Sequence, residues 1–219
     1  MNHLGLWWSG GDAISHAVAA LLMLMSIGAW VVIFWKGAVL RRAQRDLRIA
    51  VPRFWAAADL PTARESLAGV DREGVLLTLL DAALQRPSAG TLEAGGQEGS
   101  QLTRRLREAL HAVLRRLRFG QVLLASVGSV APFVGLFGTV WGIYHALVRI
   151  ASEGNITIDK VAGPVGEALI MTAAGLAVAI PAVLAYNIFN KAVSTCEADL
   201  EGYAHDLREM LLDVQRSGG

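Results

Sequence analysis

Three long apolar segments dominate the pattern of hydrophobic and polar positions along the chain, and polar segments separate them. The apolar segments cover residues 13–35, 121–148 and 161–189. A helix rises about 1.5 Å per residue, so about 20 residues cross the roughly 30 Å hydrocarbon core of a bilayer. Lipid admits only helices and closed barrels, and these segments lack the alternation of barrel strands. The pattern therefore predicts an all-α integral membrane protein with three transmembrane helices.

The polar segment between the first two spans, residues 36–120, predicts short helices joined by turns. Asp59 and Pro61 are typical of a helix start, and Gly69 is typical of its end. A second helical run covers residues 74–86 and stops before a proline. Residues 87–101 are rich in Gly, Ser and Ala, so we expect a loop there.

A leucine stripe follows this loop and predicts a longer helix. Its members recur every three or four residues, which places them on one helix face: Leu102, Leu106, Leu110, Leu114 and Leu117. No proline intervenes before Pro132, so we expect spans two and three to extend into long cytoplasmic helices, span two from Gln101 and span three through residue 214. The stripe needs a partner, which is either the C-terminal tail of the same chain or a neighbouring copy.

The distribution of basic residues predicts the orientation of the spans. Arg41, Arg42 and Arg45 follow span one, and Arg115 and Arg116 precede span two, whereas the loop 149–160 is short and nearly neutral. Because Lys and Arg accumulate in cytoplasmic loops, residues 1–12 and 149–160 are expected outside, and residues 36–120 and 190–219 inside. Span one lacks the positive leader and cleavage site of a signal peptide, so we expect it to remain as an anchor.

Composition mainly excludes classes of site and partner. The single cysteine, Cys196, rules out a disulfide within the chain and a metal site built on several cysteines. The net charge of +1 comes without a basic, aromatic-interleaved patch, so no nucleic-acid partner is expected. No zinc spacing, phosphate loop or nucleophile–base pair occurs, so the sequence predicts no enzyme, no metal and no cofactor.

Glu167 is the one acidic residue within the apolar segments. An ionisable group in the membrane is destabilising by several kcal/mol and by default marks function, here as a proton-binding carboxylate. The alternative is that Glu167, six residues past Val161 and hence about 9 Å into the span, reaches back to water near the helix N-terminus.

Two threonines lie at similar depth in spans two and three, because a short loop makes these spans antiparallel neighbours. Thr139 lies ten residues before Arg149, and Thr172 lies eleven residues after Val161. Either the two hydroxyls belong to a functional surface with Glu167, or each bonds back to its own helix. Glu167 and Thr172 are five residues apart, about 140° around an ideal helix, so both cannot point at one narrow axis.

Small residues recur along spans two and three and predict close helix packing. In the absence of a hydrophobic force between helices in lipid, such residues let backbones approach; the glycines concerned are Gly135, Gly138, Gly142 and Gly175. Pro132 and Pro181 each remove a backbone hydrogen bond and can kink their helices.

Three continuous segments carry a family resemblance: residues 131–143 (APFVGLFGTVWGI), 159–172 (DKVAGPVGEALIMT) and 175–187 (GLAVAIPAVLAYN). They resemble the MotA/TolQ/ExbB proton-channel family, and within it the ExbB branch. The match is close over spans two and three and extends to layout only over the rest of the chain. Flagellar stator subunits have four spans, which argues against that branch.

The resemblance implies a fold, partners and site residues. The family's essential glutamate falls on Glu167, and its two pore threonines fall on Thr139 and Thr172. Such proteins lie in the bacterial inner membrane with a periplasmic N-terminus and a cytoplasmic C-terminus. They form homo-oligomeric rings, expected here as a pentamer in membrane lipid. An ExbD-like single-span subunit places its helices and an aspartate in the pore, and a TonB-like energy transducer docks outside.

From this resemblance follows a functional hypothesis, in which the chain is the pore-forming subunit of a proton-driven motor for transport at the outer membrane. Protons would cross along Glu167, Thr139 and Thr172, neutralise the partner's aspartate and let its helix rotate. The alternatives are a TolQ-type subunit that works with TolR and TolA in envelope integrity, and a passive membrane scaffold without ion flow.

Overall fold

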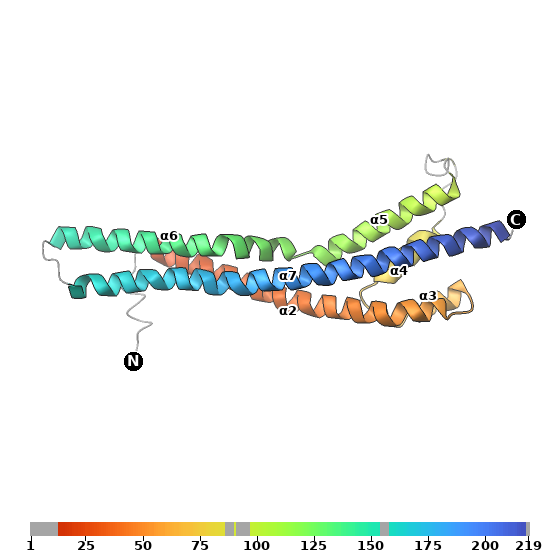
Figure 1. The fold of residues 1–219 in the computed structure, drawn as a ribbon, viewed down its shortest axis with the longest axis horizontal. Coiled ribbons are helices and arrows are strands. Elements are labelled where there is room, and N and C mark those ends of the chain that lie inside the picture. Colours follow the sequence, from red (N-terminus) through yellow and green to blue (C-terminus); the bar gives the residue numbers. More distant parts are fainter. Residues whose placement is uncertain (1–12, 86–89, 91–96, 154–157, 218–219) are drawn as a thin grey trace. The chain divides into compact units, whose positions relative to one another are not determined.

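A computed structural model describes residues 13–85, 90, 97–153 and 158–217 of the chain, and the regular structure within these residues is helical. The helices are α2 (Ala13–Trp55), α3 (Leu60–Ala68), α4 (Val75–Leu84), α5 (Glu98–Arg118), α6 (Gln121–Glu153) and α7 (Ile158–Ser217) (Figure 1). The chain forms two compact units. We call Met1–Trp35 with Gly120–Ile188 the apolar unit, and Lys36–Phe119 with Phe189–Gly219 the charged unit.

The apolar unit contains the predicted spans. Within the described residues, three helices are long and apolar enough to cross a membrane. Large hydrophobic side chains cover their outer surface; Met23 is 63% exposed, and Phe34 and Phe133 are each 70% exposed. A water-soluble protein rarely exposes so much contiguous apolar surface, whereas lipid or other membrane helices can cover it. The all-helical fold with three helices suited to a bilayer is therefore confirmed.

The prediction of one long helix from Gln101 through span two is wrong. Helix α5 ends at Arg118, and α6 begins at Gln121. Between them Gly120 has a φ of 84°, a left-handed conformation that is open to glycine because it has no Cβ, and the Phe119 N–H donates to the carbonyl of Arg116. The Phe-Gly pair was the missed stop signal. Span three, in contrast, continues through α7 to Ser217 without interruption.

Heptad packing holds the charged unit together. Helix α2 buries Leu40, Ala43, Leu47, Ala50 and Phe54, and α7 buries Val193, Cys196, Leu200, Tyr203 and Leu207. These positions alternate in steps of three and four, the spacing of a coiled-coil seam. The two helices lie side by side, because the rings of Phe54 and Tyr203 are 5.2 Å apart and the Gln44 side chain donates to the Ala192 carbonyl at 3.4 Å.

The leucine stripe of α5 is buried in the same unit, as the sequence predicts. Its helix contacts the C-terminal tail at two places. Arg118 Nη2 lies 2.7 Å from Glu197 Oε2, and Arg208 Nε donates to Thr103 Oγ1 at 2.8 Å. Helix α5 therefore contacts the tail of the same chain, one of the two partners expected, through residues beside the stripe, and it also packs against α4, which was not expected.

The short helices begin where the sequence predicts, and a buried carboxylate that the sequence analysis did not single out caps the second of them. The Asp59 carboxylate caps α3 by accepting from the Thr62 N–H at 2.8 Å, and its hydrogen bonds with Thr62 lower the pKa of Asp59. Gly69 ends this helix, and α4 begins directly after Gly74. This carboxylate belongs to Asp71, and it accepts hydrogen bonds from the backbone N–H groups of residues 75, 76 and 77 in the first turn of α4.

The predicted loop at 87–101 is wrong at its end, because α5 already begins at Glu98. Residues 86–89 and 91–96, which make up most of this loop and include Pro87, lie outside the described residues.

Lys36, which directly follows the predicted first span, is not an exposed charge. Its side chain is fully buried in the charged unit, and its amine donates to the Arg116 carbonyl at 3.1 Å, near the C-terminal end of α5 where a cation is favourable.

Candidate functional site

The candidate site lies where α6 and α7 pack against each other in the apolar unit, and two glycines allow the approach (Figure 1). A Cβ atom added at Gly135 would lie 2.6 Å from the Met171 carbonyl oxygen. One added at Gly175 would lie 2.7 Å from the Ala131 carbonyl oxygen and 3.1 Å from the Gly135 Cα. Real Cβ atoms do not approach backbone oxygens this closely, so the contact is between backbones and excludes any larger residue.

This close approach brings the two threonine hydroxyls together. Thr139 Oγ1 lies 2.5 Å from Thr172 Oγ1. It also lies 3.1 Å from two carbonyl oxygens, that of Gly135 on its own helix and that of Ala168 on α7. Thr139 thus bonds within its own helix and also contacts α7, and the functional surface with Glu167 stays a prediction.

Each threonine hydroxyl has one proton to donate, so each can be the donor in only one of these hydrogen bonds at a time. If Thr139 donates to a carbonyl, its oxygen can accept the proton of Thr172. The Thr172 oxygen then keeps free lone pairs for another donor. Thr139 is only 7% exposed, whereas Thr172 is half-buried, so Thr172 is the member of the pair that an outside group can reach.

The remaining small residues of α6 line the same contact. A Cβ at Gly138 would lie 2.9 Å from a methyl of Val18 on α2, and one at Gly142 would lie 3.0 Å from the Ala168 Cβ. Pro132 lies inside α6, and Pro181 lies inside α7. Gly128 belongs to the same series but was not singled out from the sequence. A side chain there would collide with Val183 of α7, and its place three residues before Ala131 was the available signal.

Glu167 lies beside this network on an exposed part of α7. The next residue, Ala168, is 4% exposed and accepts the hydrogen bond from Thr139, whereas Glu167 itself is exposed. Its neighbours Leu169 and Ile170 are 58% and 55% exposed, so the carboxylate shares an apolar surface. Among the described residues, none forms a hydrogen bond or ion pair with Glu167. The structure therefore brings Thr139 and Thr172 into contact but leaves Glu167 outside that contact.

The polar groups of this arrangement are two hydroxyls and a carboxyl group. In the described ranges, no three His, Cys, Asp or Glu side chains come close enough to hold a metal ion. A carboxyl group can gain and lose a proton, and a hydroxyl pair can accept a hydrogen bond on one side while donating on the other.

Comparison with known proteins shows the family to which the chain belongs. The family model described as the MotA/TolQ/ExbB proton channel family matches residues 72–202. A biopolymer transport protein ExbB of Neisseria meningitidis is 40% identical over 98% of this chain and 100% of the relative. Another ExbB, of Xanthomonas campestris pv. campestris, is 42% identical over 95% of this chain and 86% of the relative.

A more distant relative belongs to another branch. The Tol-Pal system protein TolQ of Pseudomonas aeruginosa is 33% identical over 87% of this chain and 85% of the relative. The apolar helices together with the ExbB relatives make this an inner-membrane protein. The chain belongs to the MotA/TolQ/ExbB proton channel family.

Proposed function

We propose that this chain is the pore-forming subunit of an ExbB–ExbD-type motor that uses the proton motive force to energise TonB-dependent transport across the outer membrane. One observation carries the proposal: the single acidic side chain of the apolar segments, Glu167, lies exposed on an apolar surface of α7, directly before Ala168, whose carbonyl accepts from Thr139. The family match and the names of the ExbB relatives support it.

A ring of subunits explains why Glu167 can be tolerated at this position. A carboxylate on a lipid-facing surface is destabilising by several kcal/mol, so such residues face a bundle interior or a water-filled cavity. Further copies of this chain, expected as a pentamer, would enclose the apolar surface around Glu167. Within such a ring, burial and the like charges of neighbouring copies would favour proton uptake by the carboxylate.

The motor needs a moving part that this chain does not contain. An ExbD-like single-span subunit would place its helices within the ring, and its aspartate would exchange protons along Glu167, Thr139 and Thr172. Moving one charge through 100 mV of membrane potential supplies about 2.3 kcal/mol, enough to drive rotation of a helix between two positions. A TonB-like transducer on the periplasmic side would carry the resulting force to the outer membrane.

Replacement of the carboxyl group tests this function. Glu167→Gln keeps the shape of the side chain but cannot release a proton, so the variant should assemble with the ExbD-like subunit while transport falls to background. Growth on a substrate that requires TonB-dependent uptake, together with co-purification of the complex, measures both properties. Glu201→Gln is the matched control, because it removes an exposed carboxylate from the charged unit of the same helix; it should transport normally.

Two other outcomes separate the rival functions. Full uptake by the Glu167→Gln variant would contradict proton transfer at this residue and favour a passive scaffold. Co-purification with a TolR-like subunit in place of an ExbD-like subunit would assign the same chemistry to the Tol-Pal system.

A further inference from the structure

A histidine of α6, His145, lies on the same flank of the α6–α7 pair as Glu167. We call the side of this pair that faces Val18 of α2 the Glu167 flank. Gly138 marks it on α6, because a Cβ there would lie 2.9 Å from a Val18 methyl and 3.1 Å from the Met171 Cβ of α7. His145 lies seven residues after Gly138, a rotation of about 700°, so its side chain leaves α6 within about 20° of the same direction.

The threonine hydroxyls lie on the opposite flank. On α7, Glu167 lies four residues before Met171, so the two side chains leave the helix about 40° apart, on the Glu167 flank. Thr172 is about 140° from Glu167 around the helix, and Ala168, which faces α6, lies between them. The Thr172 hydroxyl meets that of Thr139. Each flank therefore carries its own polar groups, a pair of hydroxyls on one and a carboxyl group with an imidazole ring on the other.

His145 and Glu167 also lie at nearly the same depth. A Cβ at Gly142 would lie 3.0 Å from the Ala168 Cβ, so the two helices are in contact at this level. The helices are antiparallel (Figure 1), so Glu167, one residue before Ala168, lies about 1.5 Å further out than this level. His145, three residues after Gly142, lies about 4.5 Å further out. The depths of the two groups therefore differ by about 3 Å.

The surroundings hold the ring of His145 in place and leave room for water beside Glu167. The ring is half-buried, and its centroid lies 4.8 Å from the ring of Trp141 and 5.7 Å from that of Tyr144. On α7, Gly163 lies about one turn outward of Glu167, and a Cβ added there would meet no described atom within 4 Å. The outward side of the carboxyl group is thus bordered by a residue without a side chain.

Other titratable groups near this depth are less suited to exchange protons with Glu167. Arg149 lies four residues beyond His145 on α6, and its guanidinium does not release a proton in proteins. On α2, His16 lies two residues before Val18, so it points about 160° away from the flank. Tyr144 is exposed on α6, about 100° from His145 around the helix. Among the described side chains near this depth, His145 is thus the proton carrier that shares the flank of Glu167.

We propose that His145 relays protons between the outer side of the membrane and Glu167, an inference that rests on the proposed motor. The neutral ring accepts a proton from water and, as imidazolium, donates one to a Glu167 carboxylate oxygen. The ring is then neutral again and the carboxyl group holds the proton, so no other bond changes. Among the described residues none bonds to Glu167, so the transfer uses a bridging water or a new side-chain rotamer.

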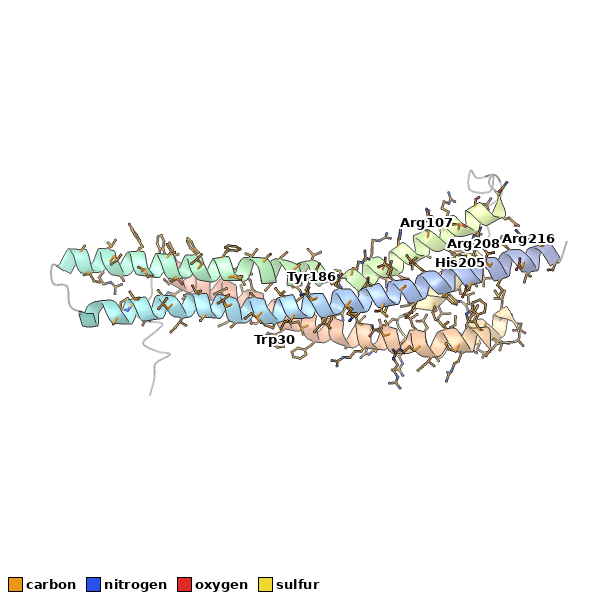
Figure 2. The ribbon with its side chains drawn as sticks, in the orientation of Figure 1. Trp30, Arg107, Tyr186, His205, Arg208 and Arg216 are labelled. Atoms are coloured by element: carbon orange, nitrogen blue, oxygen red, sulfur yellow. The ribbon has the colours of Figure 1, made fainter. Side chains whose placement is uncertain are left out.

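A phenylalanine at this position separates proton transfer from aromatic packing. His145→Phe keeps a ring against Trp141 and Tyr144 but has no nitrogen to carry a proton. Proton influx into proteoliposomes that hold the complex with the ExbD-like subunit, followed with an internal pH dye, should fall on the order of tenfold or more. The matched control is His205→Phe, which replaces an exposed histidine of the charged part of α7 (Figure 2) and should leave the influx unchanged.

Chemical rescue gives a second readout that a structural role would not move. His145→Ala should also slow the influx, and free imidazole in the buffer should restore part of it by taking the place of the missing ring. Imidazole should not restore the influx of Glu167→Gln, which excludes its carrying protons through the lipid. The loss in His145→Ala should shrink as the outer pH falls, because hydronium then protonates Glu167 without a relay.

The outcomes distinguish the relay from the motor itself. Parent-like influx through His145→Phe would show that the ring only packs, and slow influx in both variants without rescue or pH dependence would assign His145 a structural role. Either result overturns the relay, and the motor still stands if Glu167→Gln abolishes transport. Full transport by Glu167→Gln would overturn both.

Discussion

At the scale of single residues, the hydroxyl of Thr172 is the most exposed part of the network between α6 and α7. It lies 2.5 Å from the Thr139 oxygen, whose own proton can be donated to either of two carbonyl oxygens at 3.1 Å. Thr139 is therefore fixed by its surroundings, whereas Thr172 has capacity for a further hydrogen bond. This difference makes Thr172 the better position at which to separate packing from proton transfer.

Removal of this one hydroxyl should impair transport more than stability. Thr172→Val keeps the branched shape but loses the bond to Thr139, and a hydrogen bond within a membrane bundle contributes about 0.6 kcal/mol on average. We expect an assembled ring with a slightly lower thermal midpoint and strongly reduced uptake. Thr172→Ser, which restores the hydroxyl, should recover most of the uptake. Equal transport by the valine and serine variants would assign Thr172 a packing role alone.

The residues of the candidate site could be read from the sequence, but their bonding could not. Depth estimates from the short loop placed Thr139 and Thr172 at one level, and the structure has them in contact. Whether each threonine bonded to its own helix or to the next depended on the rotation of α6 about its axis. Glycine contacts set that rotation, and these depend on distances that a pattern of small residues does not contain.

At the scale of helices, the backbone contact between α6 and α7 is the feature that positions the site. Gly135 and Gly175 face each other so closely that their Cα atoms serve as the contact surface. Lipid supplies no hydrophobic force between helices, so this area of close packing is a main source of their association. The hydroxyl pair forms one turn further along the same contact, and it depends on the same separation of the helices.

Adding a methyl group at this contact should push the helices apart. In Gly135→Ala the new Cβ would lie 2.6 Å from the Met171 carbonyl oxygen, and overpacking of this kind destabilises by about 1–3 kcal/mol. The matched control is Gly202→Ala in the charged part of α7, where a Cβ meets nothing within 4 Å. It should be neutral or stabilising by up to about 1 kcal/mol. Thermal unfolding in detergent compares the two, and equal midpoints would contradict the close contact.

Helix starts and stops show where local rules suffice and where they fail. Asp59 and Gly69 bound α3 as predicted, because a side-chain cap and a glycine act within a few residues. The break at Gly120 was missed because the leucine stripe runs up to Leu117, the apolar span follows directly, and no proline lies between them. The burial of Lys36 could not be predicted from the local sequence pattern either, since the carbonyl that accepts its hydrogen bond lies 80 residues away in the sequence.

At the scale of the whole molecule, charge and apolar surface are divided between the two units. The apolar unit exposes large hydrophobic side chains, such as Phe133 and Val140, while the charged unit exposes arginines and acids over heptad-packed cores. The divide falls at Lys36 and at Phe189, close to the predicted ends of spans one and three. One unit suits lipid and the other suits water, and the positive-inside rule predicts that the charged unit lies in the cytoplasm.

Cysteine labelling in intact cells tests this orientation, and the native cysteine of the chain should not react with the label. Its single cysteine, Cys196, is fully buried, and burial together with the nearby charge of Asp199 raises the pKa of its thiol to about 11. Because only the thiolate reacts, the parent chain should not label at pH 7.5. Ser152→Cys, at the outer end of α6, should label with a membrane-impermeant maleimide, whereas Arg45→Cys should label only after the inner membrane is opened. Labelling of Arg45→Cys in intact cells would reverse the predicted topology and place the charged unit in the periplasm.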